Sequence, residues 1–349
     1  MKWKLRSNPT VAIVGCTGAV GRELIRLIDE RHPAFGEIVL LASESSAGTK
    51  LSIRGDAAEI RSLHGHDFSS TDIAFFAVGA EMSDGHVPRA AAQGCLVIDK
   101  SSAFRMKPEV PLVVPQVNAH AMAERPVSNI IASPNCSTIP LVRALAPLHA
   151  SLGLRSVVVS TYQAASGVGL ASIQDLLDDS RLCLEEGAGE RASRFPRPLA
   201  FNVVPQIDAF GADGFTAEER KLVTESRKIL GDPSLAVTGT TVRVPVVNVH
   251  AEAVYVQCAR ATTREEIITL LGSGAGLRVE ERIDGYATPR FNPDPDAVSI
   301  GRIRVNPDDP SGVWMWLVAD NLRPGAALNA LQIAELALEL SRGQRVPIA

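Results

Sequence analysis

A glycine-rich turn between a short apolar strand and a helix is the feature that most restricts the fold of this chain. Residues 10–14 predict the strand, and Gly15, Gly18 and Gly21 follow it at intervals of three residues. Leucine and isoleucine then recur at helical spacing. Such glycines permit a tight turn and let the backbone approach a pyrophosphate at the helix N-terminus. Because the spacing differs from the usual G-x-G-x-x-G, a plain glycine turn before a helix stays the alternative to a dinucleotide site.

Strands and helices alternate through the segment that follows. Residues 37–41, 73–78 and 96–99 predict strands, and residues 84–93 predict a helix. The strands are near-continuous apolar runs, which is typical of parallel strands covered on both faces. The pattern predicts an α/β fold with a Rossmann-type, doubly wound parallel sheet.

The segment after the second strand bears on the choice of cofactor. NAD-specific folds carry an acidic residue at this point, which binds the ribose hydroxyls. Here Ser43, Ser46 and Lys50 could accept a 2′-phosphate, whereas Glu44 would favour NAD if its side chain turned inward. The sequence therefore favours NADP and leaves NAD open.

The pattern changes after residue 134, where longer strands rich in β-branched residues begin. A second domain with a partly antiparallel sheet is therefore predicted. Residues 180–200 are charged and rich in proline and glycine, so they are predicted to form a loop. The apolar helix at 326–340 could return to pack on the first domain. The other elements predicted in this part are strands at 155–161, 237–259 and 314–319 and a polar helix at 216–230.

Composition excludes several classes of protein. The chain has 349 residues, a net charge of -4 and a pI near 6.0, which argues against nucleic acid as its partner. Its five scattered cysteines suit a reducing compartment, and no Cys/His cluster has the spacing of metal ligands. No stretch approaches the roughly 18 apolar residues that span a membrane, and the polar start is no signal peptide. A soluble, cytoplasmic protein of two domains is the expectation.

Cys136 lies at the junction of a predicted strand and a predicted helix. The apolar run at 127–132 ends in Pro134 and Asn135, and a helical pattern begins at Ser137. Cys136 is therefore at, or one residue before, a helix N-terminus, where the positive end of the dipole favours a thiolate. A thiolate here is a good nucleophile. A small buried hydrophobic residue, the usual role of a free cysteine, is the alternative.

His250 is the best candidate for a base that works with this thiol. It lies in a hydrophobic β-rich stretch beside Glu252, seven residues after Arg243. On a regular strand an odd separation puts two side chains on opposite faces. Arg243 and His250 can therefore share a site only if the strand is broken between them, and Pro245 and Asn248 make a break plausible. A satisfied structural histidine is the alternative.

A thiolate, a histidine and a nicotinamide cofactor together suggest oxidation or reduction through a thioester. The thiolate attacks an acyl carbon, a hydride moves between the cofactor and the thiohemiacetal, and the histidine exchanges the proton. Amide donors hold the developing oxyanion.

Several motifs give the chain a resemblance to the aspartate-β-semialdehyde dehydrogenase family over nearly its whole length. Each motif is weak to moderate alone, but their joint occurrence in this order is highly specific. They are VAIVGCTGAVG at 11–21, LLASESSAGTKL at 40–51, IDKSSAFRM at 98–106, SPNCSTIP at 133–140, TYQAASGVG at 161–169, NVVPQIDAF at 202–210, EERKLVTESRKIL at 218–230, TTVRVPV at 240–246 and DNLRPGAALNALQIAE at 320–335.

The resemblance implies a role for individual residues. Cys136 matches the nucleophile, His250 the acid–base catalyst and Gln163 the residue that positions the acyl-enzyme. Residues that match substrate or phosphate contacts are Arg105, Asn135 and Lys221 for phosphate, and Glu219 and Arg243 for the substrate amino and carboxylate groups. Residues that match the cofactor site are Gly15, Thr17, Gly18, Ala19, Val20, Gly21, Ser43, Ser46, Ser166, Gly167 and Asn321.

The resemblance also implies an activity and an assembly. The activity is the NADPH-dependent reductive dephosphorylation of L-4-aspartyl phosphate to L-aspartate 4-semialdehyde and phosphate, which feeds lysine, methionine, threonine and isoleucine synthesis. The implied domains are an NADP-binding Rossmann domain at 1–134 plus 322–349 and a catalytic and dimerisation domain at 135–321. The expected assembly is a homodimer or a dimer of dimers, with no metal, membrane or nucleic acid partner.

The sequence departs from the family pattern at a few positions. Lys100 stands where asparagine is usual, and Cys16, an expected structural residue, replaces a common alanine. Val249 and Ala251 flank His250 where glycine and serine are usual, so we expect slower turnover without loss of activity.

Three alternatives remain from the sequence. An N-acetyl-γ-glutamyl-phosphate reductase would carry Gly-Cys-Tyr-Pro around its nucleophile, and a phosphorylating glyceraldehyde-type dehydrogenase would carry Ser-Cys-Thr-Thr; neither is present. A non-catalytic paralogue that binds a nucleotide or a partner is the third, and the intact Cys136 argues against it.

Overall fold

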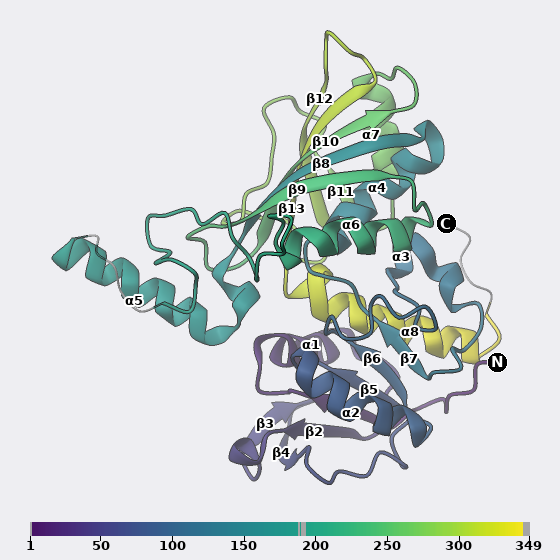
Figure 1. Cartoon of the computed structure of the whole chain (residues 1–349). Helices are drawn as coiled ribbons and strands as arrows, with labels where there is room; N and C mark the ends of the chain where they lie inside the picture. Colours follow the sequence, from purple (N-terminus) through teal and green to yellow (C-terminus); the bar gives the residue numbers. More distant parts are fainter. Residues whose placement is uncertain (1, 188, 190–192, 345–349) are drawn as a thin grey trace. The chain divides into compact units, whose positions relative to one another are not determined.

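The chain divides into two units, each built around one sheet (Figure 1). The first unit comprises Met1–Asn135 and Ala326–Ala349, and the second comprises Cys136–Gly325. The computed structural model describes residues 2–187, 189 and 193–344. Among these residues, no helix has the length and apolar character needed to cross a membrane.

The first unit contains a sheet in the order β3-β4-β2-β1-β5-β6-β7. All its neighbouring strands are parallel except the β3–β4 hairpin. Its strands are β1 (Val11–Val14), β2 (Ile38–Ala42), β3 (Lys50–Ile53), β4 (Asp56–Ser62), β5 (Ile73–Phe76), β6 (Leu96–Asp99) and β7 (Ile130–Ala132). Its helices are α1 (Ala19–Arg31), η1 (Glu44–Ser46), α2 (Ala80–Ala92), α3 (Pro115–Asn118), η2 (Ala119–Met122) and α8 (Leu328–Ser341).

Strand β1 is the point at which this sheet changes its direction of winding. It pairs with β2 on one side and with β5 on the other, both in parallel. In such sheets ligands bind outside the carboxyl ends of the strands at this point, and the carboxyl end of β1 leads directly into Gly15. The Rossmann-type sheet predicted from the sequence is therefore confirmed.

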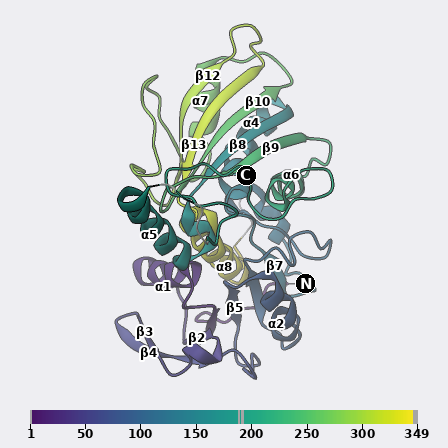
Figure 2. The ribbon, with the colours of Figure 1, turned by 60° about the vertical axis from the view of Figure 1, so that its left-hand side comes forward.

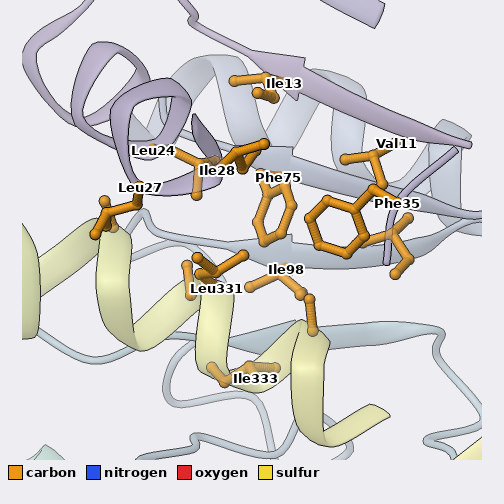
Figure 3. Packing of buried hydrophobic residues seen from close by; sticks show 14 of the residues in the cluster. Val11, Ile13, Leu24, Leu27, Ile28, Phe35, Phe75, Ile98, Leu331 and Ile333 are labelled. Atoms are coloured by element: carbon orange, nitrogen blue, oxygen red, sulfur yellow. The ribbon is translucent and has the colours of Figure 1, made fainter. Parts of the chain in front are cut away.

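The core of the first unit joins strands and helices from both ends of the chain (Figure 3). Ile13 of β1, Leu24 of α1 and Phe75 of β5 are packed in one cluster with Leu331 of α8. The apolar C-terminal helix thus packs on the first unit, as its sequence predicts.

The second unit contains a mixed sheet in the order β11-β12-β13-β10-β8-β9 (Figure 2). The pairs β8–β9 and β11–β12 are parallel and the others antiparallel. Its strands are β8 (Leu154–Gln163), β9 (Ala236–Arg243), β10 (His250–Cys258), β11 (Leu277–Val279), β12 (Val298–Val305) and β13 (Gly312–Ala319). Its helices are α4 (Thr138–Leu152), η3 (Ala165–Val168), α5 (Leu170–Glu186), α6 (Ala217–Leu230) and α7 (Arg264–Gly272), and a π-helical turn, η4 (Arg323–Ala327), leads out of it.

One face of this sheet is covered by helices. Side chains of α4, α6 and α7 form an apolar core with alternate residues of β8, β10 and β13. Val157 and Val159 of β8 belong to this core, so Val158 between them points to the other face, where it is 41% exposed. That face therefore carries apolar side chains that the unit itself does not cover.

The β-rich stretch predicted at 237–259 is two strands. Residues 244–249, here called the 244–249 connection, carry the chain from β9 past the end of β8 to β10. Val246 and Val247 accept hydrogen bonds from the N–H groups of Ala165 and Ser166 at 2.8 and 3.0 Å. The break expected between Arg243 and His250 is therefore present.

Two predicted elements need correction. Residues 180–186 are helical, because Leu176 and Cys183 of α5 pack on Phe195 and Leu199, and this cluster outweighs the polar composition. Residues 188 and 190–192 of the predicted loop lie outside the described residues. The strand predicted at 127–132 covers only Ile130–Ala132, and Val127 is 82% exposed.

Candidate active site

Gln163, Arg243 and His250 form one row across the end of the second unit's sheet. Gln163 is the last residue of β8 and pairs with Arg243, the last residue of β9. His250 is the first residue of β10, where the neighbouring pair is Ala251 with Tyr162, so its register places it opposite Gln163. The three side chains share a face because the 244–249 connection resets the alternation that a continuous strand would impose. All three are buried.

Cys136 lies against the imidazole of His250. Its Sγ atom is 3.5 Å from Nε2. Cys136 is half-buried and directly precedes Ser137, the N-cap of α4, so the N–H groups and dipole of that helix favour a negative sulfur. The predicted junction of strand and helix is confirmed, and the thiol has the neighbour that nucleophilic catalysis requires.

The other ring nitrogen of His250 fixes its tautomer. Nδ1 accepts a hydrogen bond from the N–H of Ala164 at 3.0 Å. A neutral imidazole that accepts at Nδ1 carries its proton on Nε2, the atom that faces Cys136. Burial lowers the pKa of His250 well below its ordinary value of 6.5, and the charge of Arg243 lowers this pKa further. A neutral His250 therefore offers a proton toward the sulfur.

Arg243 is a buried cation without a carboxylate partner. Its Nη1 atom donates to the carbonyl of Ala164 at 2.7 Å, and within the described residues no carboxylate lies within 4.0 Å of its guanidinium. Burial lowers the pKa of Arg243, while the neighbouring Cys136 and Glu218 raise it. A guanidinium in this state is suited to a planar anion such as a substrate carboxylate.

Two adjacent glutamates of α6 have different environments. Glu219 closes a capping box, because its Oε2 accepts from the N–H of Thr216 at 2.7 Å and its Oε1 from the N–H of Thr241 at 3.1 Å. Glu218 instead accepts from Nε2 of Gln163 at 3.1 Å and from Nζ of Lys221 at 2.9 Å. Glu218, which the sequence analysis did not select, is thus the carboxylate that contacts the row of Gln163, Arg243 and His250.

Lys221 is held by two carboxylates. Its Nζ atom donates to Glu218 and, at 2.6 Å, to Asp208. Burial lowers the pKa of Lys221, but the two carboxylates outweigh burial and raise it to about 12. Lys221 is therefore charged and firmly placed.

Ser166, Gly167 and Asn321 lie together beside His250. The amide of Asn321 donates to Oγ of Ser166 at 3.0 Å and accepts from the N–H of Val249 at 3.0 Å. A Cβ atom on Gly167 would lie 2.9 Å from Nη1 of Arg243 and 3.4 Å from the ring of His250. A side chain at 167 would therefore displace the guanidinium of Arg243 and lie tightly against His250.

The glycine turn of the first unit has the shape that a dinucleotide needs. Gly15 has a φ of 81°, and a Cβ atom on Gly21 would lie 2.2 Å from the carbonyl oxygen of Gly15. Gly18 is the N-cap of α1 and leaves the first N–H groups of this helix without a side-chain cap. Thr17, Ala19 and Val20 complete the turn and are half-buried. The turn therefore fits a nicotinamide dinucleotide.

Other residues of the first unit that the sequence analysis selected differ in their exposure. Ser43 and Glu44 are exposed and Ser46 is half-buried in the segment after β2. Cys16 is buried, and burial raises its pKa to about 11, so it is a structural residue as expected. Among the residues with assigned structure, no group of three or more His, Cys, Asp or Glu could hold a metal ion.

Arg105 and Asn135 are also in the first unit, and both are buried. Arg105 donates from Nε to the carbonyl of Ser133 at 3.0 Å and from Nη2 to the carbonyl of Lys100 at 2.7 Å. Arg105 thus lies over the segment that leads to Cys136.

A further buried carboxyl lies one row behind His250. Glu252 is on the same face of β10 and opposite Thr161. It is 1% exposed, and neither of its oxygens has a hydrogen-bond partner within the described chain. Burial raises the pKa of Glu252 well above 4.5.

A dinucleotide-type unit followed by a unit with a thiol–imidazole pair defines a semialdehyde dehydrogenase of the thioester type. The family models agree: residues 10–125 match "Semialdehyde dehydrogenase, NAD binding domain" and residues 145–324 match "Semialdehyde dehydrogenase, dimerisation domain". The chain is 42% identical over 329 residues to aspartate-semialdehyde dehydrogenase of Aquifex aeolicus, covering 93% of this chain and 97% of that protein. It is 38% identical over 334 residues to the Bacillus subtilis enzyme, covering 93% and 96%. The chain belongs to the aspartate-semialdehyde dehydrogenase family.

Solved structures of aspartate-semialdehyde dehydrogenases have the same fold as this chain. Aspartate semialdehyde dehydrogenase II of Vibrio cholerae, complexed with ASA, superimposes with a TM-score of 0.92 at 40% identity over 96% of this chain and 99% of that one. The Candida albicans enzyme with NADP gives a TM-score of 0.75 at 25% identity, covering 96% and 100%.

Proposed function

We propose that the chain catalyses the NADPH-dependent reductive dephosphorylation of L-4-aspartyl phosphate to L-aspartate 4-semialdehyde through a thioester on Cys136. The observation that carries this proposal is the 3.5 Å approach of Cys136 Sγ to His250 Nε2 beside the buried guanidinium of Arg243. The family to which the chain belongs supports it, as does the substrate complex of the Vibrio cholerae relative. The product of this step is the precursor of lysine, methionine, threonine and isoleucine.

Each end of the substrate has a candidate partner. Arg243 binds the α-carboxylate with a bidentate fork. Glu218 accepts from the α-amino group, a role that we give to Glu218 because it contacts Gln163 of the row, whereas Glu219 binds the backbone N–H groups of Thr216 and Thr241. We assign the phosphate of the substrate to Arg105, Asn135 and Lys221, which the resemblance selects.

The cofactor is a nicotinamide dinucleotide, and we propose NADP rather than NAD. The glycine turn at 15–21 would hold the pyrophosphate at the N-terminus of α1. Ser43 and Ser46, which the resemblance selects, would accept the 2′-phosphate. Ser166, Gly167 and Asn321 would contact the nicotinamide end. When bound, the reduced cofactor supplies a hydride to the acyl carbon.

The residues of the second unit account for the other steps. Cys136 attacks as a thiolate, so the C–S bond forms and the C–O bond to phosphate breaks. His250 donates the Nε2 proton to the oxyanion that develops after reduction and takes it back as the C–S bond breaks, which releases the aldehyde and the thiolate, while the proton of the overall reaction goes to the departing phosphate. Gln163, held by Thr161 and Glu218, positions the acyl group. Overall, the acyl phosphate, the reduced cofactor and one proton are converted to the aldehyde, the oxidised cofactor and phosphate.

A homodimer is the assembly that the dimerisation domain indicates. The sheet face opposite α4 supports this, because Trp314, Tyr255 and Val158 form one row across β13, β10 and β8. Trp314 and Val158 are 39% and 41% exposed. We propose that a second copy covers this face.

The test of the function uses two substitutions in one assay. Wild-type protein should reduce NADP with aspartate semialdehyde only when phosphate or arsenate is present. Cys136→Ser should abolish this activity, and His250→Ala should lower it at least about a hundredfold. NADPH affinity of both variants should stay within about twofold, because neither residue is part of the glycine turn. The assignment would be refuted if either variant retained activity. It would also be refuted if the wild-type protein were active only with N-acetylglutamate semialdehyde.

A further inference from the structure

Val249, the residue before His250, has a backbone conformation that a β-branched residue rarely adopts. Its φ is 72°, in the left-handed region, where a Cβ atom collides with the neighbouring carbonyl and valine is an outlier. Glycine, which has no Cβ atom, adopts such a φ without strain. Because the side chain is only 8% exposed and packs with Ala251 and Val318, the conformation is set inside the fold.

Hydrogen bonds from one side chain hold this strained peptide in place. The N–H of Val249 donates to Oδ1 of Asn321 at 3.0 Å. Nδ2 of Asn321 donates to Oγ of Ser166 at 3.0 Å, and Ser166 donates to Oδ1 of Asn248 at 2.8 Å. Nδ2 of Asn248 in turn donates to Asp320 at 3.0 Å. Asn321 is 2% exposed, so water does not replace it.

The conformation of Val249 decides where β10 begins. β10 starts at His250, which pairs with Ala319 of β13. From this first position the ring of His250 meets both the N–H of Ala164 at 3.0 Å and the sulfur of Cys136 at 3.5 Å. If Val249 relaxed toward an extended conformation, the chain would enter β10 along another direction, and the two contacts would not form together.

We propose that Asn321 is a positioning residue for His250. Its side chain accepts a hydrogen bond from the N–H of Val249 and so holds the strained peptide, and this peptide keeps the imidazole of His250 against Cys136. This inference rests on the proposed function, in which Asn321 also contacts the cofactor and His250 is the acid. The side chain of Asn321 would then have two roles. Binding of the cofactor and the position of His250 would be linked through the side-chain amide of Asn321. The dependence is stronger in this chain than it would be with glycine at 249.

The test is a double-mutant cycle read by the reactivity of Cys136 without cofactor or substrate. Wild type, Asn321→Ala, Val249→Gly and the double variant are alkylated with iodoacetamide between pH 5.5 and 9, and the Cys136 peptide is quantified by mass spectrometry. Asn321→Ala should slow alkylation at pH 7 by about tenfold or more, because release of the strain moves the imidazole away from the sulfur. The double variant should alkylate within about threefold of Val249→Gly alone, since glycine needs no support at this φ.

Asn321→Ala/Val249→Ala is the matched control. Alanine removes the same packing but keeps a Cβ atom, so this variant should stay as slow as Asn321→Ala. The proposal would be overturned by any of three results: additive effects of the two substitutions on the alkylation rate, equal recovery of that rate by alanine and by glycine at position 249, or an unchanged rate in Asn321→Ala. If Asn321→Ala does not fold, recovery of folded protein by Val249→Gly and not by Val249→Ala supports it, and recovery by neither overturns it.

Steady-state kinetics separate this inference from the proposed function. In the double variant kcat should recover while the KM for NADP stays raised, because the contact of Asn321 with the cofactor is still missing. A wild-type protein that does not oxidise aspartate semialdehyde, but gives a non-additive alkylation cycle, would refute the function and leave the positioning role intact. The opposite pair of results would refute the positioning role alone.

Discussion

Exchanging each of the two adjacent glutamates of α6 for glutamine tests which of them binds the substrate. Glu219→Gln keeps size and helix position but leaves one carbonyl oxygen where two carboxylate oxygens accept the N–H groups of Thr216 and Thr241. Glu218→Gln makes the same chemical change one residue earlier, where the carboxylate contacts Gln163 and Lys221.

The expected magnitudes follow from burial. Glu219 is 7% exposed, so the N–H group that loses its acceptor stays buried at a cost of about 1–3 kcal/mol. At roughly 2–4 °C per kcal/mol this lowers Tm by several degrees. Glu218 is 4% exposed, so Glu218→Gln, which weakens its bonds to Gln163 and Lys221, should cost a similar amount, about 1–3 kcal/mol. Losing the charge that accepts the substrate amino group should also raise KM about tenfold or more.

Thermal unfolding and phosphate-dependent oxidation of aspartate semialdehyde are measured on both variants and the wild type. The expected pattern is a lower Tm for both variants, with a nearly unchanged KM for Glu219→Gln and a raised KM for Glu218→Gln. The reverse pattern would refute the assignment of Glu218 to the substrate and return that role to Glu219. Equal effects on KM would mean that the helix as a whole shifts.

Two further predictions concern the glycine turn and the buried carboxyl. Gly21→Ala should lower NADPH affinity at least about tenfold, because its Cβ atom would lie 2.2 Å from the Gly15 oxygen. Gly85→Ala is the control, because a Cβ atom at this position would have no heavy atom within 4 Å. Equal NADPH affinities of the two variants in titration calorimetry would contradict the expectation. Burial raises the pKa of Glu252 above 4.5, so the folded protein keeps a proton that the unfolded chain releases, and this group's contribution to stability falls as pH rises above 4.5. Glu252→Gln should therefore raise Tm relative to wild type more at pH 8 than at pH 4.5, and a difference independent of pH would count against it.

Local signals in the sequence predicted much of the fold and of the site. The glycine turn and the alternation of apolar strands predicted the first sheet, because each element carries its own periodicity. The break between Arg243 and His250 was predictable since Pro245 and Asn248 interrupt the strand, and an odd separation otherwise forbids a shared face. Cys136 was predictable because a proline-containing junction precedes a helical pattern.

The roles of Glu218 and Glu219 could not be separated in the same way. Adjacent residues on a helix point about 100° apart, and which of them faces the site depends on how α6 packs on β9. One signal was available: Thr216 and Glu219 have the T-x-x-E spacing of a capping box, which predicts that Glu219 serves the helix end. Helix α5 was missed because its support comes from Phe195 and Leu199, which are distant in sequence.

The row formed by His250, Gln163 and Arg243 has a consequence for substitutions within the site. Neighbouring strands lie about 4.8 Å apart, so the backbones that carry the acid and the carboxylate-binding guanidinium are separated by about 10 Å, with one strand between them. The separation of these two backbones is fixed by main-chain hydrogen bonds, which side-chain substitutions do not alter. We therefore expect substitutions within the row to change how far these side chains reach, while the backbones that carry them stay at the same separation.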